Sequence, residues 1–123
     1  MAEMVAGPVQ PGKPYMTLDG SLISELVRPE RGGSRNVSVA VGVIEPGERT
    51  RPHRHTESDE VYYVLSGKGV VTLGEKCYAV GPGSCVLTPA GHVHSVRCTG
   101  NEALRILCIC APPYTHEQTS ALD

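Results

Sequence analysis

The sequence predicts an all-β fold, an antiparallel sandwich or barrel built as one domain, and three observations lead to this prediction. Short apolar runs with alternating side chains recur along most of the chain. Turn residues separate these runs at nearly regular spacing, in a chain that contains 14 Gly and 10 Pro. No segment shows the period of a convincing helix. A chain of 123 residues has room for one core and not for two.

The first expected strands follow an N-terminal arm. Residues 1–14 are rich in Pro and Gly and predict a flexible arm. Residues 15–27 carry short apolar runs around a turn signal at Asp19-Gly20, and residues 28–35 form a charged, Gly-rich loop. In residues 37–44 every second residue is a valine, which is the period-two signature of a strand.

Further strand regions are expected up to a proline stop. They cover residues 53–65, 70–73, 77–80, 84–88, 92–98 and 103–110. Pro112-Pro113 ends the last of them, because proline cannot donate a hydrogen bond to a strand ladder. The barrel domain is therefore expected at residues 15–113, and residues 114–123 form a C-terminal tail that either folds back or stays loose.

Composition and charge exclude several classes of partner. A net charge of -2 and a pI near 6.2 leave no basic face for nucleic acid. No apolar stretch approaches the length that spans a bilayer, so no membrane contact is expected. The N-terminal arm lacks a charged start followed by an apolar run, so no signal peptide is expected and the predicted location is cytoplasmic.

The cysteines predict buried free thiols. Their number is odd, and their spacing matches neither paired zinc knuckles nor a secreted disulfide framework. All of them lie in apolar or strand-like surroundings, where free thiols behave as small hydrophobic residues in a reducing compartment. They are Cys77, Cys85, Cys98, Cys108 and Cys110.

Three histidines and a glutamate carry the strongest chemical signal. His53 and His55 are two residues apart, so on a strand both imidazoles point to the same face. Glu60 begins the next apolar run, and His94 follows a turn on another expected strand. A single histidine would be interpreted as an ordinary surface or hydrogen-bonded residue. Together the four residues predict a site for one divalent transition metal (Mn, Fe, Co, Ni, Cu or Zn) with one or two open coordination positions.

Two segments hold these residues at fixed spacings. From Gly47 the sequence runs G-E-R-T-R-P-H-R-H-T-E-S-D-E-V-Y-Y-V-L-S-G, and from Gly83 it runs G-S-C-V-L-T-P-A-G-H-V-H-S-V-R-C. These segments resemble the two motifs of the cupin superfamily, G-x5-H-x-H-x4-E-x6-G and G-x5-P-x-G-x2-H-x3-N. The departure is Cys98, at the position where the family usually has Asn. The chain resembles a small, single-domain cupin.

This resemblance implies a jelly-roll β-barrel in which His53, His55, Glu60 and His94 hold the metal. It also implies a homodimer, since such barrels often pair through their outer sheets and sometimes exchange N-terminal strands. The substitution at Cys98 leaves the ligand set in place, because the family's Asn is not usually a ligand. No role is carried over to that position.

Three residues near the expected metal are candidate catalytic groups, each with a simpler alternative. Arg51 has the strand parity of the first two histidines and either points a guanidinium at an anionic ligand or is a solvated arginine. Tyr62 has the parity of the glutamate and either donates a hydrogen bond near the metal or packs in the core. His92 is either a general acid or base, or a polar residue at the end of a turn.

Two further groups of residues are candidates. Cys98, Cys108 and Cys110 are either thiols that ligate the metal or react near it, or buried small hydrophobic residues. Tyr114 and His116 are candidates for capping the barrel, although no spacing requires it.

These features predict a metal-dependent enzyme, of the dioxygenase, lyase or isomerase type, that acts on a small anionic or carbonyl-bearing metabolite. In this hypothesis the metal is a Lewis acid or the site of O2 activation, Arg51 holds the anionic end of the substrate, and Tyr62 or His92 moves protons. Two alternatives stay open: a non-catalytic module that senses or sequesters a small ligand or metal, and a remnant barrel with a structural metal. A fold of this type does not choose between them.

Overall fold

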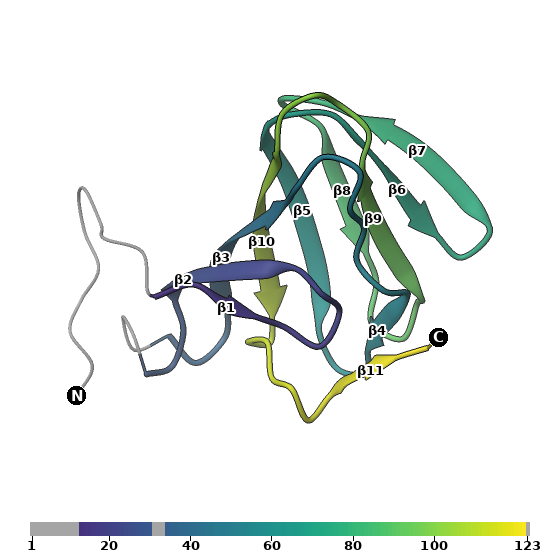
Figure 1. Ribbon diagram of the computed structural model, residues 1–123. Helices are drawn as coiled ribbons and strands as arrows, with labels where there is room; N and C mark the ends of the chain where they lie inside the picture. Colours follow the sequence, from purple (N-terminus) through teal and green to yellow (C-terminus); the bar gives the residue numbers. More distant parts are fainter. Residues whose placement is uncertain (1–12, 31–33, 123) are drawn as a thin grey trace.

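Two antiparallel sheets make up the structure (Figure 1). The computed structural model describes residues 13–30 and 34–122, which contain eleven strands and no helix, so the all-β prediction is confirmed. The larger sheet has six strands in the order β1-β2-β3-β10-β5-β8, and the smaller has five in the order β11-β4-β9-β6-β7. The expected N-terminal arm falls almost entirely outside the described residues, as does part of the expected loop at 28–35.

The larger sheet brings the N-terminal strands beside strands from the second half of the chain. Its members are β1 (Tyr15–Met16), β2 (Leu22–Val27), β3 (Ser38–Ile44), β5 (Asp59–Ser66), β8 (Cys85–Thr88) and β10 (Leu104–Ala111). β10 lies near the centre of this sheet and pairs with β3 on one side and β5 on the other.

The smaller sheet carries most of the histidines. Its members are β4 (His53–His55), β6 (Gly69–Leu73), β7 (Lys76–Val80), β9 (His94–Cys98) and β11 (Thr119–Ala121). β9 pairs with β4 on one side and with β6 on the other, and β6 and β7 form a hairpin at the sheet edge. The sheet is completed by the last strand of the chain, which pairs with β4.

The expected strand over residues 53–65 is divided into β4 and β5, because the chain crosses here from the smaller sheet to the larger one. The crossing is held by Gln118, whose side-chain oxygen accepts hydrogen bonds from the backbone N–H groups of Glu57 (2.8 Å) and Ser58 (2.9 Å). Gln118 directly precedes β11, so the tail folds back over the barrel rather than extending away from it.

The apolar core lies between the two sheets. Its most deeply buried aliphatic side chains are Val64, Val71, Val96, Leu104 and Ile106. On β3 the buried positions are Ser38, Gly42 and Ile44, while the alternating valines are only partly buried. Because small side chains predominate on the inward face of β3, this part of the sheet borders a cavity rather than a filled core.

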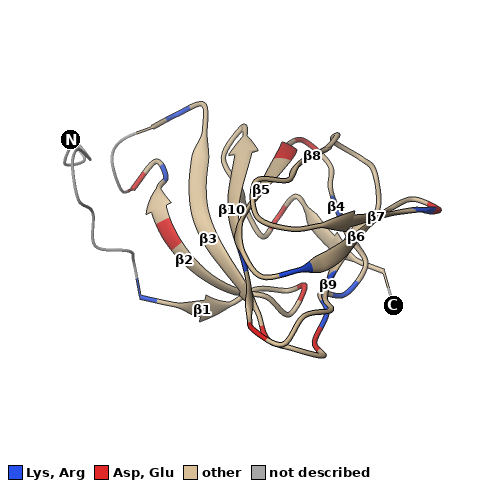
Figure 2. Ribbon diagram, turned by 90° about the horizontal axis from the view of Figure 1, so that it is seen from above, with Lys and Arg blue, Asp and Glu red and all other residues tan. Residues whose placement is uncertain are grey.

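Acidic and basic residues are interspersed along the described chain, mostly in loops and at strand ends (Figure 2). Within the described part of the chain, no helix is long and apolar enough to cross a membrane.

All five cysteines are free, but the prediction that all are buried is wrong for two of them. Cys77 and Cys85 are exposed, because they lie on β7 and β8, which are the edge strands of their sheets. Cys98 and Cys110 are buried and Cys108 is partly buried.

The lack of space for a side chain at Gly69 leads to a testable prediction. A Cβ atom there would lie 2.4 Å from the carbonyl oxygen of Arg97 and 2.7 Å from Cδ2 of Leu104. We expect Gly69→Ala to lower the free energy of unfolding by about 1–3 kcal/mol, the usual cost of overpacking. Urea unfolding measures the difference.

Gly81→Ala is the matched control, because nothing lies within 4 Å of its Cβ position. The control is expected to change the free energy of unfolding by less than about 0.5 kcal/mol. Equal unfolding midpoints for the two variants would contradict the tight packing described at Gly69.

Candidate metal centre

Four side chains from three strands converge between the sheets. His53 and His55 come from β4 and His94 from β9, all in the smaller sheet, while Glu60 comes from β5 in the larger sheet. One ligand atom from each residue lies within 4.8 Å of the others, and all four residues are buried. We call these four residues the candidate metal centre.

Backbone carbonyls orient two of the imidazoles. Nδ1 of His53 lies 2.7 Å from the carbonyl oxygen of Arg51, and Nδ1 of His94 lies 3.1 Å from that of His92. A carbonyl oxygen only accepts, so each Nδ1 carries the proton and the Nε2 of the neutral ring keeps a free lone pair. Proteins commonly fix the orientation of metal-binding histidines by a bond of this kind to the second ring nitrogen.

Thr119 orients the third imidazole. Its hydroxyl donates to the carbonyl oxygen of Thr115 (2.8 Å), so it is left to accept at its 2.9 Å contact with Nδ1 of His55. His55 therefore also carries its proton on Nδ1 and presents a free Nε2. Because Thr119 belongs to β11, the last strand of the chain sets the tautomer of a histidine on β4.

The free nitrogens face a carboxylate oxygen rather than a hydrogen-bond donor. Oε1 of Glu60 is 3.0 Å from Nε2 of His55 and 3.2 Å from Nε2 of His94. With Nδ1 protonated, each Nε2 lone pair points at a negatively charged oxygen, which is unfavourable unless a proton or a cation lies between them. Nε2 of His53 is buried without a hydrogen-bond partner. This donor set fits a divalent transition metal, which would satisfy all four residues together.

Burial and mutual contacts favour the protonation states that bind metal. Burial raises the pKa of Glu60, but a proton between Oε1 and the Nε2 atoms of His55 and His94 outweighs burial and holds the pKa well below its usual range, as a bound cation would. Burial lowers the pKa of His53, and the neighbouring His94 ring lowers it further. An ionised carboxylate and a neutral imidazole are the forms that ligate a metal.

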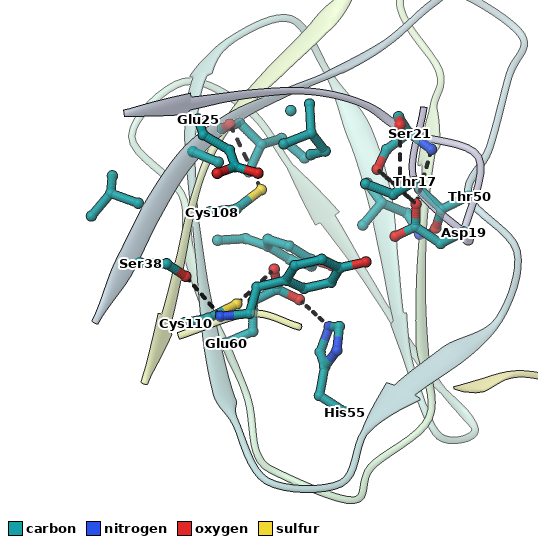
Figure 3. A pocket seen from close by; sticks show the side chains of 18 of the residues that line it. Thr17, Asp19, Ser21, Glu25, Ser38, Thr50, His55, Glu60, Cys108 and Cys110 are labelled. Carbon is teal, nitrogen blue, oxygen red and sulfur yellow. Dashed lines mark hydrogen bonds and ion pairs between the residues drawn. The ribbon is translucent and has the colours of Figure 1, made fainter. Parts of the chain in front are cut away.

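A cavity lies beside the candidate metal centre (Figure 3). His55 and Glu60 line it, whereas His53 and His94 do not. Much of its wall is apolar and comes from Ile23, Val27, Ile44, Val96 and Ile106. A ligand in this cavity would therefore meet the centre from the side of His55 and Glu60.

One of the three candidate catalytic residues lies beside the centre. Tyr62 is 4% exposed, lines the cavity and has its ring centroid 5.7 Å from that of His94. Arg51 is exposed, with its guanidinium 3.5 Å from the carbonyl oxygen of Leu18, and His92 is also exposed. Neither Arg51 nor His92 lines the cavity.

Two of the three candidate thiols lie near the centre. Cys110 and Cys108 line the cavity, and Sγ of Cys110 donates to Oε2 of Glu60 at 3.4 Å. Burial, together with the charge of Glu60, raises the pKa of Cys110, so its thiol stays protonated. Cys98 is buried elsewhere, and its Sγ donates to the carbonyl oxygen of Glu102 at 3.3 Å.

Three residues outside the motifs complete the site. Thr119 orients His55, and the ring of Tyr114 lies with its centroid 5.6 Å from that of His55. Asp19 brings Oδ2 to 3.1 Å from Nε2 of His53, with a geometry that makes no hydrogen bond. The sequence predicted a turn at Asp19 but gave no indication of its contact with His53. It also did not predict the contact of Thr119, because the sequence did not decide whether the C-terminal tail folds back.

Known proteins resemble this chain over most of its length. The family model for the cupin domain matches residues 40–110. An uncharacterized protein of Methanocaldococcus jannaschii is 39% identical over 111 residues, which cover 90% of this chain and 89% of that protein. An oxalate-binding protein of Thermotoga maritima is 33% identical over 66 residues, or 54% of each chain. The crystal structure of a predicted oxalate decarboxylase from the same organism has a TM-score of 0.72 at 25% identity, covering 85% of this chain and 93% of that one.

The contact between Thr119 and His55 makes a testable prediction. Thr119→Val removes the acceptor that holds the Nδ1 proton of His55, so we expect the affinity for a divalent metal such as Co²⁺ to fall about 10- to 100-fold. Calorimetric titration of metal into the apoprotein measures this affinity. Thr119→Ser keeps the hydroxyl and is expected to bind within about threefold of wild type. Wild-type affinity in the valine variant would show that Thr119 does not support the centre.

Proposed function

Because this chain belongs to the cupin domain family, we propose that it is a metal-dependent enzyme that acts on a small carbonyl- or carboxylate-bearing metabolite. The observation that carries the proposal is that the candidate metal centre and the cavity share two residues. His55 and Glu60 belong to the candidate metal centre and also line the cavity, so a ligand bound there meets the ligand side of the centre. A metal that served only to hold the barrel together would not need such access.

His53, His55, Glu60 and His94 would hold one divalent metal, which would supply Lewis-acid chemistry or a site for O2 activation. Three imidazoles and one carboxylate leave coordination positions open, and several first-row metals accept this donor set.

The chain's own residues contribute water exclusion and orientation. The aliphatic side chains of the cavity wall keep the ligand in a region of low dielectric, where each polar contact is stronger than in water. Tyr62 and Tyr114 line the same cavity with their rings against His94 and His55. We propose that the phenol of Tyr62 hydrogen-bonds to the bound metabolite. Arg51 and His92 lie outside the cavity, so we assign them no contact with it.

A second candidate function is binding without turnover. The likeness to an oxalate-binding protein favours it, together with the apolar character of the cavity wall. The two candidates differ in whether the metal-loaded protein consumes its ligand. Oxygen uptake by the iron-loaded form, and product formation from small carbonyl compounds with other metals, separate an enzyme from a binding protein.

We also propose that the protein forms a homodimer through the outer face of its larger sheet. Tyr63 and Leu65 on β5 are each 41% exposed, and Leu87 on β8 is 53% exposed. β5 and β8 are paired neighbours, so these side chains form one apolar patch. Apolar patches of this kind on soluble proteins commonly mark interfaces with other proteins.

Metal content gives the first prediction from this proposal. Protein purified without a histidine tag is expected to carry one divalent metal per chain, measured by elemental analysis. His55→Ala is expected to lose the metal, and His116→Ala, an exposed histidine outside the centre, to retain it. Removing the metal should also lower the melting temperature, because a ligand at a hundredfold excess over its dissociation constant stabilises the folded state by about 2.7 kcal/mol. A full equivalent of metal bound to His55→Ala would contradict the ligand assignment.

The apolar patch gives a second prediction, on oligomeric state. Leu87→Glu places a charge in the patch and is expected to convert a dimer into a monomer, as measured by sedimentation equilibrium. Leu122→Glu is the control. Leu122 is also exposed (45%), but it follows β11, which belongs to the smaller sheet, and so it lies outside the apolar patch. Dimers that persist in Leu87→Glu, or a wild-type monomer, would contradict this interface.

A further inference from the structure

Asp19 approaches the candidate metal centre from a hydrogen-bonded turn. It lies between β1 and β2, where Gly20 adopts a positive φ of 91° that favours glycine. Oδ1 of Asp19 accepts hydrogen bonds from the hydroxyl of Thr17 and from both the backbone N–H (2.9 Å) and the hydroxyl (2.7 Å) of Ser21. The backbone N–H of Arg51 donates to the carbonyl oxygen of Asp19 at 2.6 Å. These bonds hold the carboxylate in one orientation.

The second oxygen of this carboxylate is directed at the centre. Oδ2 of Asp19 is 3.1 Å from Nε2 of His53, the buried nitrogen that has no hydrogen-bond partner. Asp19 lines the cavity whereas His53 does not, so the carboxylate covers this nitrogen on the cavity side. A ligand that entered the cavity and reached the centre would therefore pass close to a fixed negative charge.

The rest of the cavity offers little positive charge to compensate. Three carboxylates line it, from Asp19, Glu25 and Glu60, and they lie on different sides of the cavity (Figure 3). Among the described residues that line the cavity, Arg28 is the one lysine or arginine. Arg28 is already bound to two carboxylates, through 2.5 and 2.6 Å contacts with Glu25 and a 2.7 Å contact with Glu30.

The proposed divalent metal would balance this excess of carboxylates and leave no positive charge for a second anionic group. A second negative charge on the ligand would meet the carboxylate of Asp19 or aliphatic side chains such as Ile23 and Ile44, where an unpaired charge is costly. We propose that the ligand of this cavity carries at most one negative charge, at its metal-binding end, and that Asp19 is the residue that disfavours dianions such as oxalate or a phosphate ester. This inference rests on the proposed function, because it assumes that the ligand binds at a loaded metal centre.

The test compares two ligands of nearly equal size. Oxamate differs from oxalate in having an amide in place of one carboxylate, so it carries one negative charge rather than two. Calorimetric titration of each into Mn²⁺-loaded protein, with bound metal measured afterwards, gives the ratio of oxalate to oxamate affinity. Asp19→Asn keeps Oδ1 as the acceptor for Thr17 and Ser21 but removes the charge, and we expect it to raise this ratio at least tenfold.

Glu75→Gln is the matched control, because it removes an exposed carboxylate in the turn between β6 and β7 and is expected to leave the ratio at the wild-type value. Glu25→Gln removes another charge of the cavity and releases Arg28 from one partner, so it is expected to raise the ratio as well. If Asp19→Asn does not fold, Glu25→Gln decides by the same criterion.

The outcomes separate this inference from the function on which it rests. A ratio that rises in the cavity variants and not in the control supports it. An unchanged ratio in proteins that carry one metal per chain overturns the charge selection and leaves the metal site intact. Wild-type protein that takes up no metal overturns the proposed function, and the inference falls with it.

Discussion

The placement of an ionised carboxylate against imidazole lone pairs in the buried interior is the constraint on which the rest of the site depends. Burying a carboxylate is costly unless hydrogen bonds or a cation compensate it, and here the nearest nitrogens have committed their protons to other acceptors. Neither sheet alone provides this arrangement, since Glu60 lies in one and the histidines in the other. The four residues of the centre therefore come together only when the two sheets pack against each other.

How well each feature could be predicted from the sequence depended on how far apart along the chain its interacting residues lie. The strands were predictable because alternation and turn residues act over a few positions, and the four residues of the centre were predictable because two of them share a strand face and all four lie in recognisable motifs. Asp19 was visible only as a turn residue, because its contact with His53 depends on how the β1–β2 turn docks. Thr119 gave no signal, since its role depends on a tail that pairs with β4 after the barrel has formed.

Strand parity was a partial guide to the surroundings of the centre. It placed Tyr62 next to the candidate metal centre, but it did not distinguish the exposed ends of strands from their buried middles. Arg51 precedes β4 and His92 precedes β9, where the backbone leaves the sheet and the side chains reach solvent. Burial of the cysteines was overestimated at Cys77 and Cys85 for a related reason, because an apolar neighbourhood in sequence does not reveal which strand will be an edge.

The bond between His55 and Thr119 joins residues 64 positions apart, and this separation sets an order of events during synthesis. His55 leaves the ribosome well before Thr119, and at translation rates of about 5–20 residues per second the interval is on the order of several seconds. During that interval the motif histidines exist without the strand that fixes the proton of one of them. A metal held by the candidate metal centre would therefore reach its final geometry only after β11 has paired with β4.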